Sequence, residues 1–168
     1  MCGIAGIVFS NSSSKLNDIE EMISTLQPRG PDDHGIWINQ EKGVALGFRR
    51  LSIIDLSQAG HQPMLSASKR FMIVFNGEIY NFKEISAELL QQGWVFRGHS
   101  DTEVLLAAIE TWGVHKSLNK FNGMFAFALW DNQDDVLYLA RDRFGEKPLY
   151  WGWSENALLF ASELKAIK

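Results

Sequence analysis

The 168-residue sequence has a single cysteine, Cys2, and a formal net charge of −4. One thiol cannot form an internal disulfide, which is typical of a reducing compartment. No apolar run approaches the ~20 residues of a membrane-spanning helix, and no basic region of a signal peptide precedes the first apolar stretch. The negative balance offers no basic surface to nucleic acid or to an anionic membrane. These absences predict a cytoplasmic protein that binds neither nucleic acid nor a membrane.

The apolar residues, 46% of the chain, are spread along its whole length without a linker, repeat or low-complexity segment. Period-two and continuous apolar runs predict strands near both ends, beginning with residues 3–9, while helical spacing predicts helices over 16–26, 82–89 and 104–112. Four strand candidates (124–131, 136–142, 148–153 and 158–163) are joined partly by hairpin-length links, which predicts an antiparallel meander. The sequence therefore predicts one α+β domain.

Local signals refine these elements. Asn17 and Glu20 have the spacing of a capping box at the start of the first helix. Gly93 and Gly113 follow the second and third helical patterns, where a glycine commonly ends a helix. Asn76 and Gly77 follow the strand candidate 71–75, and an Asn-Gly pair predicts a sharp turn.

The position of Cys2 raises a chemical possibility. If the initiator Met1 is removed, the thiol and a free α-amino group belong to the same residue. An α-amino group has an ordinary pKa of about 7.7–8.0, so it can accept the thiol proton near neutral pH without a histidine. The alternative is a small buried residue in the first strand, and the position of Cys2 alone does not decide between them.

Asn76 and Gly77 offer a second chemical feature, because a side-chain amide and an unhindered backbone N–H can point into one cavity. Two such donors suit the oxyanion that forms when a thiolate attacks a carbonyl. The alternative is a purely structural hairpin turn. The residues that follow are typical of a loop and a helix rather than of a returning strand.

Charged residues near these positions have ordinary explanations as well. Arg50 can clamp a carboxylate with two hydrogen bonds, or it can be solvated like its neighbour Arg49. Asp101 can pair with a substrate ammonium or cap the helix that follows it. Glu78 carries the same two interpretations.

A metal site is the remaining alternative. His34 follows two aspartates, and His99 lies two residues before Asp101, so a hydrolytic metal centre is conceivable. Neither an HExxH nor a CxxC pattern is present, and these spacings are unspecific. We therefore expect no metal.

The sequence resembles a known family through seven motifs in order: "MCGIAG", "RGPDDHG", "RLSIID", "FNGEIYN", "SDTEVLL", "FNGMFAFALWD" and "ARDRFGEKPLYWG". Together they are similar to the glutamine amidotransferase domain of glutamine-hydrolysing asparagine synthetases, over residues 1–168. The resemblance implies the N-terminal-nucleophile hydrolase fold, a four-layer αββα sandwich with two stacked antiparallel sheets. Related amidotransferases of sugar and nucleotide pathways carry a different segment where this chain has "RLSIID", which favours the asparagine synthetase branch.

The resemblance also implies roles in the reaction. Cys2 matches the nucleophile that attacks the side-chain amide of L-glutamine, and Asn76 and Gly77 match the oxyanion hole. The products would be glutamate and ammonia, released through a thioester.

The same resemblance implies a binding site for the ends of the amino acid. Arg50 matches the clamp on the glutamine α-carboxylate, and the backbone at Ile53 and Ile54 lines the pocket. Glu78 and Asp101 match the groups that hold the α-ammonium. A zwitterionic ligand needs opposite charges of this kind.

The expected partners are L-glutamine and a C-terminal synthetase domain, and a homodimer is left open. No cofactor is expected in this chain, since ATP and Mg²⁺ would belong to the synthetase domain, which this chain lacks. We therefore expect an N-terminal fragment of a longer enzyme. Two alternatives stay open: an amidotransferase that serves another carboxylate acceptor, and a non-catalytic regulatory domain of the same fold. An N-terminal-nucleophile acylase of another amide is disfavoured by the paired sites for an amino acid.

Overall fold

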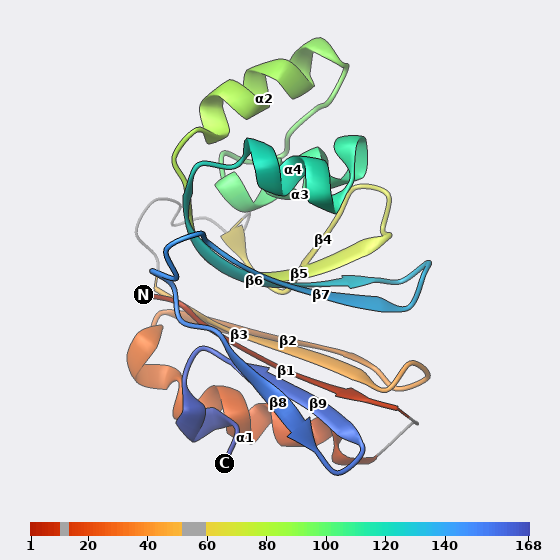
Figure 1. Ribbon diagram of the computed structural model, residues 1–168, viewed down its shortest axis with the longest axis vertical. Helices are drawn as coiled ribbons and strands as arrows, with labels where there is room; N and C mark the ends of the chain where they lie inside the picture. Colours follow the sequence, from red (N-terminus) through yellow and green to blue (C-terminus); the bar gives the residue numbers. More distant parts are fainter. Residues whose placement is uncertain (11–13, 52–59) are drawn as a thin grey trace.

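The computed structural model describes residues 1–10, 14–51 and 60–168. Two antiparallel sheets lie face to face, and helices cover both outer faces (Figure 1). The four layers follow the order helix, sheet, sheet, helix, so the predicted αββα sandwich is confirmed. Within the described residues, no helix has the length and apolar character needed to cross a membrane.

The first sheet has the strand order β2-β3-β1-β9-β8. Its strands are β1 (Gly3–Phe9), β2 (Asp33–Asn39), β3 (Val44–Arg50), β8 (Tyr150–Ser154) and β9 (Ala157–Ala161). Its outer face packs against α1 (Asp18–Thr25), which lies between the 3₁₀ helices η1 (Ser14–Asn17) and η2 (Gln27–Arg29), and beside η4 (Leu164–Ala166). Gly47 permits the close approach of α1, because a Cβ there would lie 2.3 Å from Cγ2 of Ile23.

The second sheet has the strand order β4-β5-β6-β7. Its strands are β4 (Met64–Leu65), β5 (Phe71–Ile79), β6 (Gly123–Asp131) and β7 (Val136–Arg141). Three helices cover its outer face: α2 (Phe82–Gln91), α3 (Asp101–Trp112) and α4 (Val114–Lys120). Gly93 and Gly113 both have positive φ beside these helices, as predicted for glycines at helix ends.

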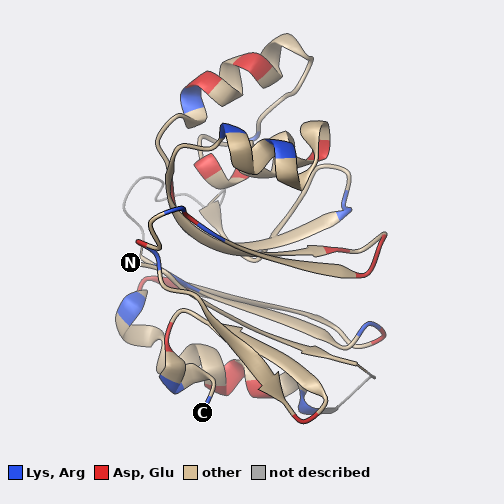
Figure 2. Cartoon of the chain, in the orientation of Figure 1, with Lys and Arg blue, Asp and Glu red and all other residues tan. Residues whose placement is uncertain are grey.

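Alternate residues of each central strand face opposite layers. In β5, Ile73 and Phe75 pack with the helices, while Met72 and Val74 belong to the core between the sheets. Both faces are buried, so this strand is apolar at consecutive positions. Charged residues lie mainly on helices, on turns and at the sheet ends near the N-terminus (Figure 2).

The predicted turn at Asn76 and Gly77 is wrong. Strand β5 continues through both residues to Ile79, and Gly77 pairs with Phe125 of β6. A Cβ at Gly77 would lie 2.4 Å from the carbonyl oxygen of Met124. The glycine thus permits a close approach of two strands rather than a reversal of the chain.

Two further predictions need correction. Asn17 makes no capping hydrogen bond through its side chain, because the chain already has helical dihedral angles there after η1. The four C-terminal strands exist, but they do not form one meander: β6 and β7 pair in the second sheet, and β8 and β9 pair in the first. The segment 142–149 crosses from one sheet to the other, a path that hydrophobic periodicity does not reveal. Helix α4 and strand β2 were not predicted at all.

Candidate active site

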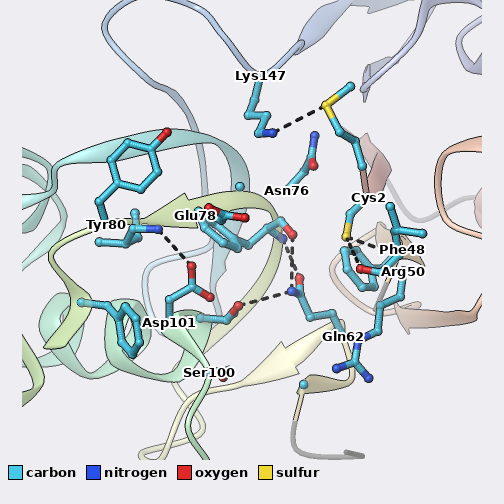
Figure 3. A pocket seen from close by; sticks show the side chains of 18 of the residues that line it. Cys2, Phe48, Arg50, Gln62, Asn76, Glu78, Tyr80, Ser100, Asp101 and Lys147 are labelled. Atoms are coloured by element: carbon cyan, nitrogen blue, oxygen red, sulfur yellow. Dashed lines mark hydrogen bonds between the residues drawn. The ribbon is translucent and has the colours of Figure 1, made fainter. Parts of the chain in front are cut away.

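A cavity of about 370 Å³ opens at the end of the sandwich where the N-terminus lies. Six of the eight residues that the resemblance assigns to the reaction or to substrate binding line it: Cys2, Arg50, Asn76, Gly77, Glu78 and Asp101. Cys2 directly precedes β1, and the others come from β3, β5 and the start of α3, elements that are distant in sequence (Figure 3). The other two candidates, Ile53 and Ile54, lie outside the described residues.

Strand alternation explains why side chains from both sheets meet here. In the first sheet Ile4 and Phe48 face the second sheet, so Cys2 and Arg50, two residues away along β1 and β3, take the same direction. In the second sheet Val74 faces the first, and Asn76 follows it by two residues. The cavity is therefore the open end of the layer between the sheets.

The thiol of Cys2 is partly buried and held by local contacts. Its Sγ accepts a hydrogen bond from the N–H of Leu51 at 3.5 Å, and the carbonyl oxygen of Cys2 accepts one from Nε of Arg29 at 2.9 Å. Burial raises the pKa of the Cys2 thiol, although the Leu51 N–H and the positive charges of the N-terminus, Arg50 and Lys147 oppose that rise. A thiol in this setting needs a base to become a nucleophile.

The Asn76 side chain is 2% exposed, and its Nδ2 has no hydrogen-bond partner among the described residues. A buried amide donor without a partner costs free energy, so its retention beside a cavity points to a ligand that accepts the hydrogen bond.

The backbone N–H of Gly77 is a second donor of this kind. The carbonyl oxygen of Phe125 accepts from the N–H of Asp142, and the N–H of Phe125 donates to the Asp142 carboxylate, so both backbone groups point to the β7 side and its pairing with Gly77 is of the non-hydrogen-bonded type. The N–H groups of Phe75, Gly77 and Ile79 consequently point away from β6. No side chain of a described residue accepts a hydrogen bond from the N–H of Gly77.

The N–H groups of Phe75 and Ile79, on either side of Gly77, both donate hydrogen bonds to side chains. Oε1 of Gln62 accepts from the N–H of Phe75 at 2.6 Å, and Oδ2 of Asp101 accepts from the N–H of Ile79 at 3.0 Å. The free N–H of Gly77 therefore lies between two occupied ones, on the edge of β5 that borders the cavity.

Arg50 is 8% exposed, and its guanidinium passes directly over Gly60. A Cβ at Gly60 would lie 2.2 Å from Nη2 of Arg50, so only a glycine leaves room for this path. The arginine is thus buried at the cavity wall rather than solvated. Arg49, in contrast, points to the outer face of the sheet, where its Nε donates to the carbonyl oxygen of Ile23 at 3.0 Å.

The two acidic candidates lie close enough to interact. Burial raises the pKa of the Asp101 carboxyl, the nearby charge of Glu78 raises it further, and backbone N–H groups, chiefly that of Ile79, partly oppose the rise. Ser100, not Asp101, caps α3 by accepting from the N–H of Glu103. The carboxylate of Asp101 instead accepts the hydrogen bond from Ile79, which connects the start of α3 to β5 at the cavity.

Sequence reasoning gave no role to Gln62, Thr102 or Lys147, which are buried polar residues that line the cavity. Gln62 lies in a loop with no distinctive pattern. Lys147 lies within "ARDRFGEKPLYWG", but nothing in that segment indicated a place beside Cys2. Its position depends on Asp142, whose carboxylate accepts backbone hydrogen bonds from Glu146 and Lys147, each at 3.0 Å.

The residues that suggested a metal centre are arranged differently. The carboxylate of Asp33 contacts Nδ1 of His61 at 2.8 Å. The same carboxylate accepts a hydrogen bond from the backbone N–H of His34 and not from its imidazole ring. His99 and Asp101 both line the cavity, but in the described part of the chain no three His, Cys, Asp or Glu residues cluster as metal ligands do.

Comparisons with known proteins agree with this geometry. The model of the glutamine amidotransferase domain family matches residues 1–168. Glutamine-hydrolysing asparagine synthetase 1 of Bacillus subtilis is 42% identical over 99% of this chain and 26% of its own length. A putative asparagine synthetase of Methanocaldococcus jannaschii is 37% identical over 99% of this chain and 35% of its own length. The chain thus spans roughly a quarter to a third of these relatives.

Solved structures show the same fold at lower identity. The glutamine phosphoribosylpyrophosphate amidotransferase of B. subtilis superimposes with a TM-score of 0.80 at 23% identity, over 99% of this chain and 43% of its own. A second structure, an allosteric regulatory enzyme of purine biosynthesis, gives 0.83 at 24% identity with the same coverage. The resemblance found in the sequence motifs is therefore confirmed, and the chain belongs to the glutamine amidotransferase domain family.

Proposed function

We propose that residues 1–168 form the glutamine-hydrolysing domain of an asparagine synthetase. The relatives with this printed name match the chain from end to end, and the cavity has the charges and donors that glutamine requires. In this proposal the domain converts glutamine and water into glutamate and ammonia, and the ammonia reaches an activated aspartate elsewhere in the enzyme.

The reaction begins at Cys2 after removal of Met1. The α-amino group of Cys2 accepts the thiol proton, and the thiolate attacks the side-chain amide carbon of glutamine. Negative charge develops on the amide oxygen, where Nδ2 of Asn76 and the N–H of Gly77 donate hydrogen bonds. Collapse of this intermediate breaks the C–N bond, and the protonated amine returns its proton to the leaving ammonia. Water then hydrolyses the thioester to glutamate.

The other end of glutamine is held by charge. The guanidinium of Arg50 pairs with the α-carboxylate, and we assign Ile53 and Ile54, which lie outside the described residues, to the same end of the substrate from the resemblance alone. Glu78 and Asp101 pair with the α-ammonium. The raised pKa of the Asp101 carboxyl fits this role, since a nearby ammonium would stabilise its charged form.

The remaining parts of the proposal concern the whole enzyme. No cofactor takes part in the glutamine reaction of this chain, and ATP and Mg²⁺ act in a C-terminal synthetase domain. The enzyme works in the cytoplasm, without nucleic acid or membrane partners.

The observation that carries the proposal is the Asn76 amide, whose Nδ2 has no acceptor among the described residues, next to the N–H of Gly77 on the strand that borders the Cys2 cavity. The test is glutamate release from glutamine by protein whose N-terminal Cys2 is verified by intact mass. The wild type should turn over, and Cys2→Ser should lose nearly all activity while unfolding at the same temperature. Normal turnover by Cys2→Ser would place the nucleophile elsewhere.

A further inference from the structure

Lys147 is a buried charge that the glutamine mechanism above does not use. The residue is 7% exposed and lines the same cavity as Cys2 and Asn76 (Figure 3). A lysine is rarely buried to this extent unless its ammonium is paired. Within residues 1–10, 14–51 and 60–168, its Nζ forms no ion pair with a carboxylate.

The contact recorded for this ammonium is with Met1. Nζ lies 3.6 Å from Sδ of Met1, and a thioether is only a weak acceptor. The proposed reaction requires removal of Met1, which takes away this contact. Lys147 and Cys2 line the same cavity, and the charge of Lys147 acts on the Cys2 thiol, so the ammonium lies near the residue that becomes the new N-terminus.

The loop that carries Lys147 is fixed rather than loose. Burial alone would raise the pKa of the Asp142 carboxyl, but the backbone N–H groups of Glu146, Lys147, Phe125 and Phe144 outweigh it and lower that pKa. In addition, Nε of Arg141 donates to the carbonyl oxygen of Lys147 at 2.6 Å. The backbone of Lys147 is thus held on both sides.

Other charged groups lie around Cys2. Positive groups come from β3 (Arg50), from η2 (Arg29, which is paired with Glu163 at 3.0 Å) and from the loop (Lys147). Acids and a histidine come from β5 and the start of α3: Glu78, Asp101 and His99. Arg50 has a proposed partner in the substrate carboxylate, and the acids in the substrate ammonium. No carboxylate of a described residue pairs with Lys147, and the proposed pose of glutamine places none of its charges there.

We infer that Lys147 is a positioning residue for the glutaminase reaction, which keeps the α-amino group of Cys2 in its neutral, proton-accepting form. An ammonium close to this amine disfavours protonation of the amine by like-charge repulsion, and burial strengthens the effect. A neutral α-amino group can accept the proton of the Cys2 thiol. The positive charge of Lys147 also favours the thiolate that results. The inference rests on the proposed function of this site.

The test compares Lys147→Met, which removes the charge at similar length, with Lys147→Arg, which keeps it. The pKa of the Cys2 α-amino group is measured directly, by ¹⁵N NMR titration of protein labelled with ¹⁵N-cysteine, because Cys2 is the single cysteine of the chain. Lys116→Met, on the exposed surface of α4, is the matched control. If Lys147→Met does not fold, Lys147→Gln replaces it.

Lys147→Met should raise this pKa by about one unit, and Lys147→Arg and Lys116→Met should leave it unchanged. In the pH profile of kcat/KM for glutamine, the pKa of the acid limb should rise by the same amount. The value of kcat/KM should therefore fall roughly fivefold at pH 7 and stay unchanged above pH 9. An unchanged α-amino pKa in a folded Lys147→Met variant would overturn the inference. Because the NMR titration needs no turnover, this result is separate from a failure of wild-type glutaminase activity, which would overturn the proposed function instead.

Discussion

The unpartnered amide of Asn76 leads to the most specific prediction. Replacement by alanine removes one donor to the oxyanion, and the loss of such a donor costs about 10²–10³-fold in kcat, or roughly 2.7–4 kcal/mol of transition-state stabilisation. The amide makes no hydrogen bond to a described residue through Nδ2, so its removal breaks no recorded contact of that atom. KM should therefore change little, and thermal unfolding should stay close to that of the wild type.

The assay is glutamate release under saturating glutamine, with kcat and KM determined separately. Asn156→Ala, on the exposed turn between β8 and β9, is the matched control and should behave as wild type. A folded Asn76→Ala variant that retains kcat within about threefold of the wild type would refute the assignment, because a true oxyanion donor contributes far more. A rise in KM at constant kcat would instead place Asn76 among the groups that hold the substrate.

Three other changes test the rest of the site. Arg50→Ala should raise the KM for glutamine roughly 10- to 150-fold with a smaller effect on kcat, since a charge-assisted hydrogen bond contributes about 1.5–3 kcal/mol; a dominant loss of kcat would contradict the clamp. Gly77→Ala should lower the free energy of unfolding by roughly 1–3 kcal/mol, because its Cβ would meet the Met124 carbonyl oxygen, and denaturant titration measures this. Asp101 must be ionised to hold an ammonium, and burial raises the pKa of its carboxyl, so KM should rise as pH falls through this raised value. Asp101→Asn should have a high KM that no longer follows pH in that range, and an unchanged pH dependence would assign it to another group.

Much of the architecture could be predicted because periodicity is local. The strand 3–9 and the ends of the second and third helices follow from apolar spacing and from glycines with positive φ. The assignment of strands to sheets could not be predicted from this signal. The crossing at residues 142–149 depends on how Asp142 binds backbone N–H groups, and that is a tertiary arrangement.

The candidate site shows the same division. Cys2, Arg50, Asn76 and Asp101 were identified from motifs, and the fold brings all four to one cavity. The local prediction at Asn76 was nevertheless wrong, since an Asn-Gly pair that usually marks a turn lies here within a long strand.

Lys147 was missed for a different reason. Its functional interest comes from burial beside the N-terminus without a carboxylate partner among the described residues, and burial of this kind exists only in the folded chain. No spacing in the sequence carries that information.

The central claim is that Cys2 is the nucleophile of a formed glutamine pocket. The most direct measurement is covalent labelling of protein with a verified N-terminal Cys2 by a glutamine-analogue diazoketone, followed by peptide mass spectrometry. The account predicts one adduct on Cys2 that excess glutamine prevents and that Arg50→Ala weakens. A folded protein that shows no such adduct, or an adduct that glutamine does not compete away, would contradict it.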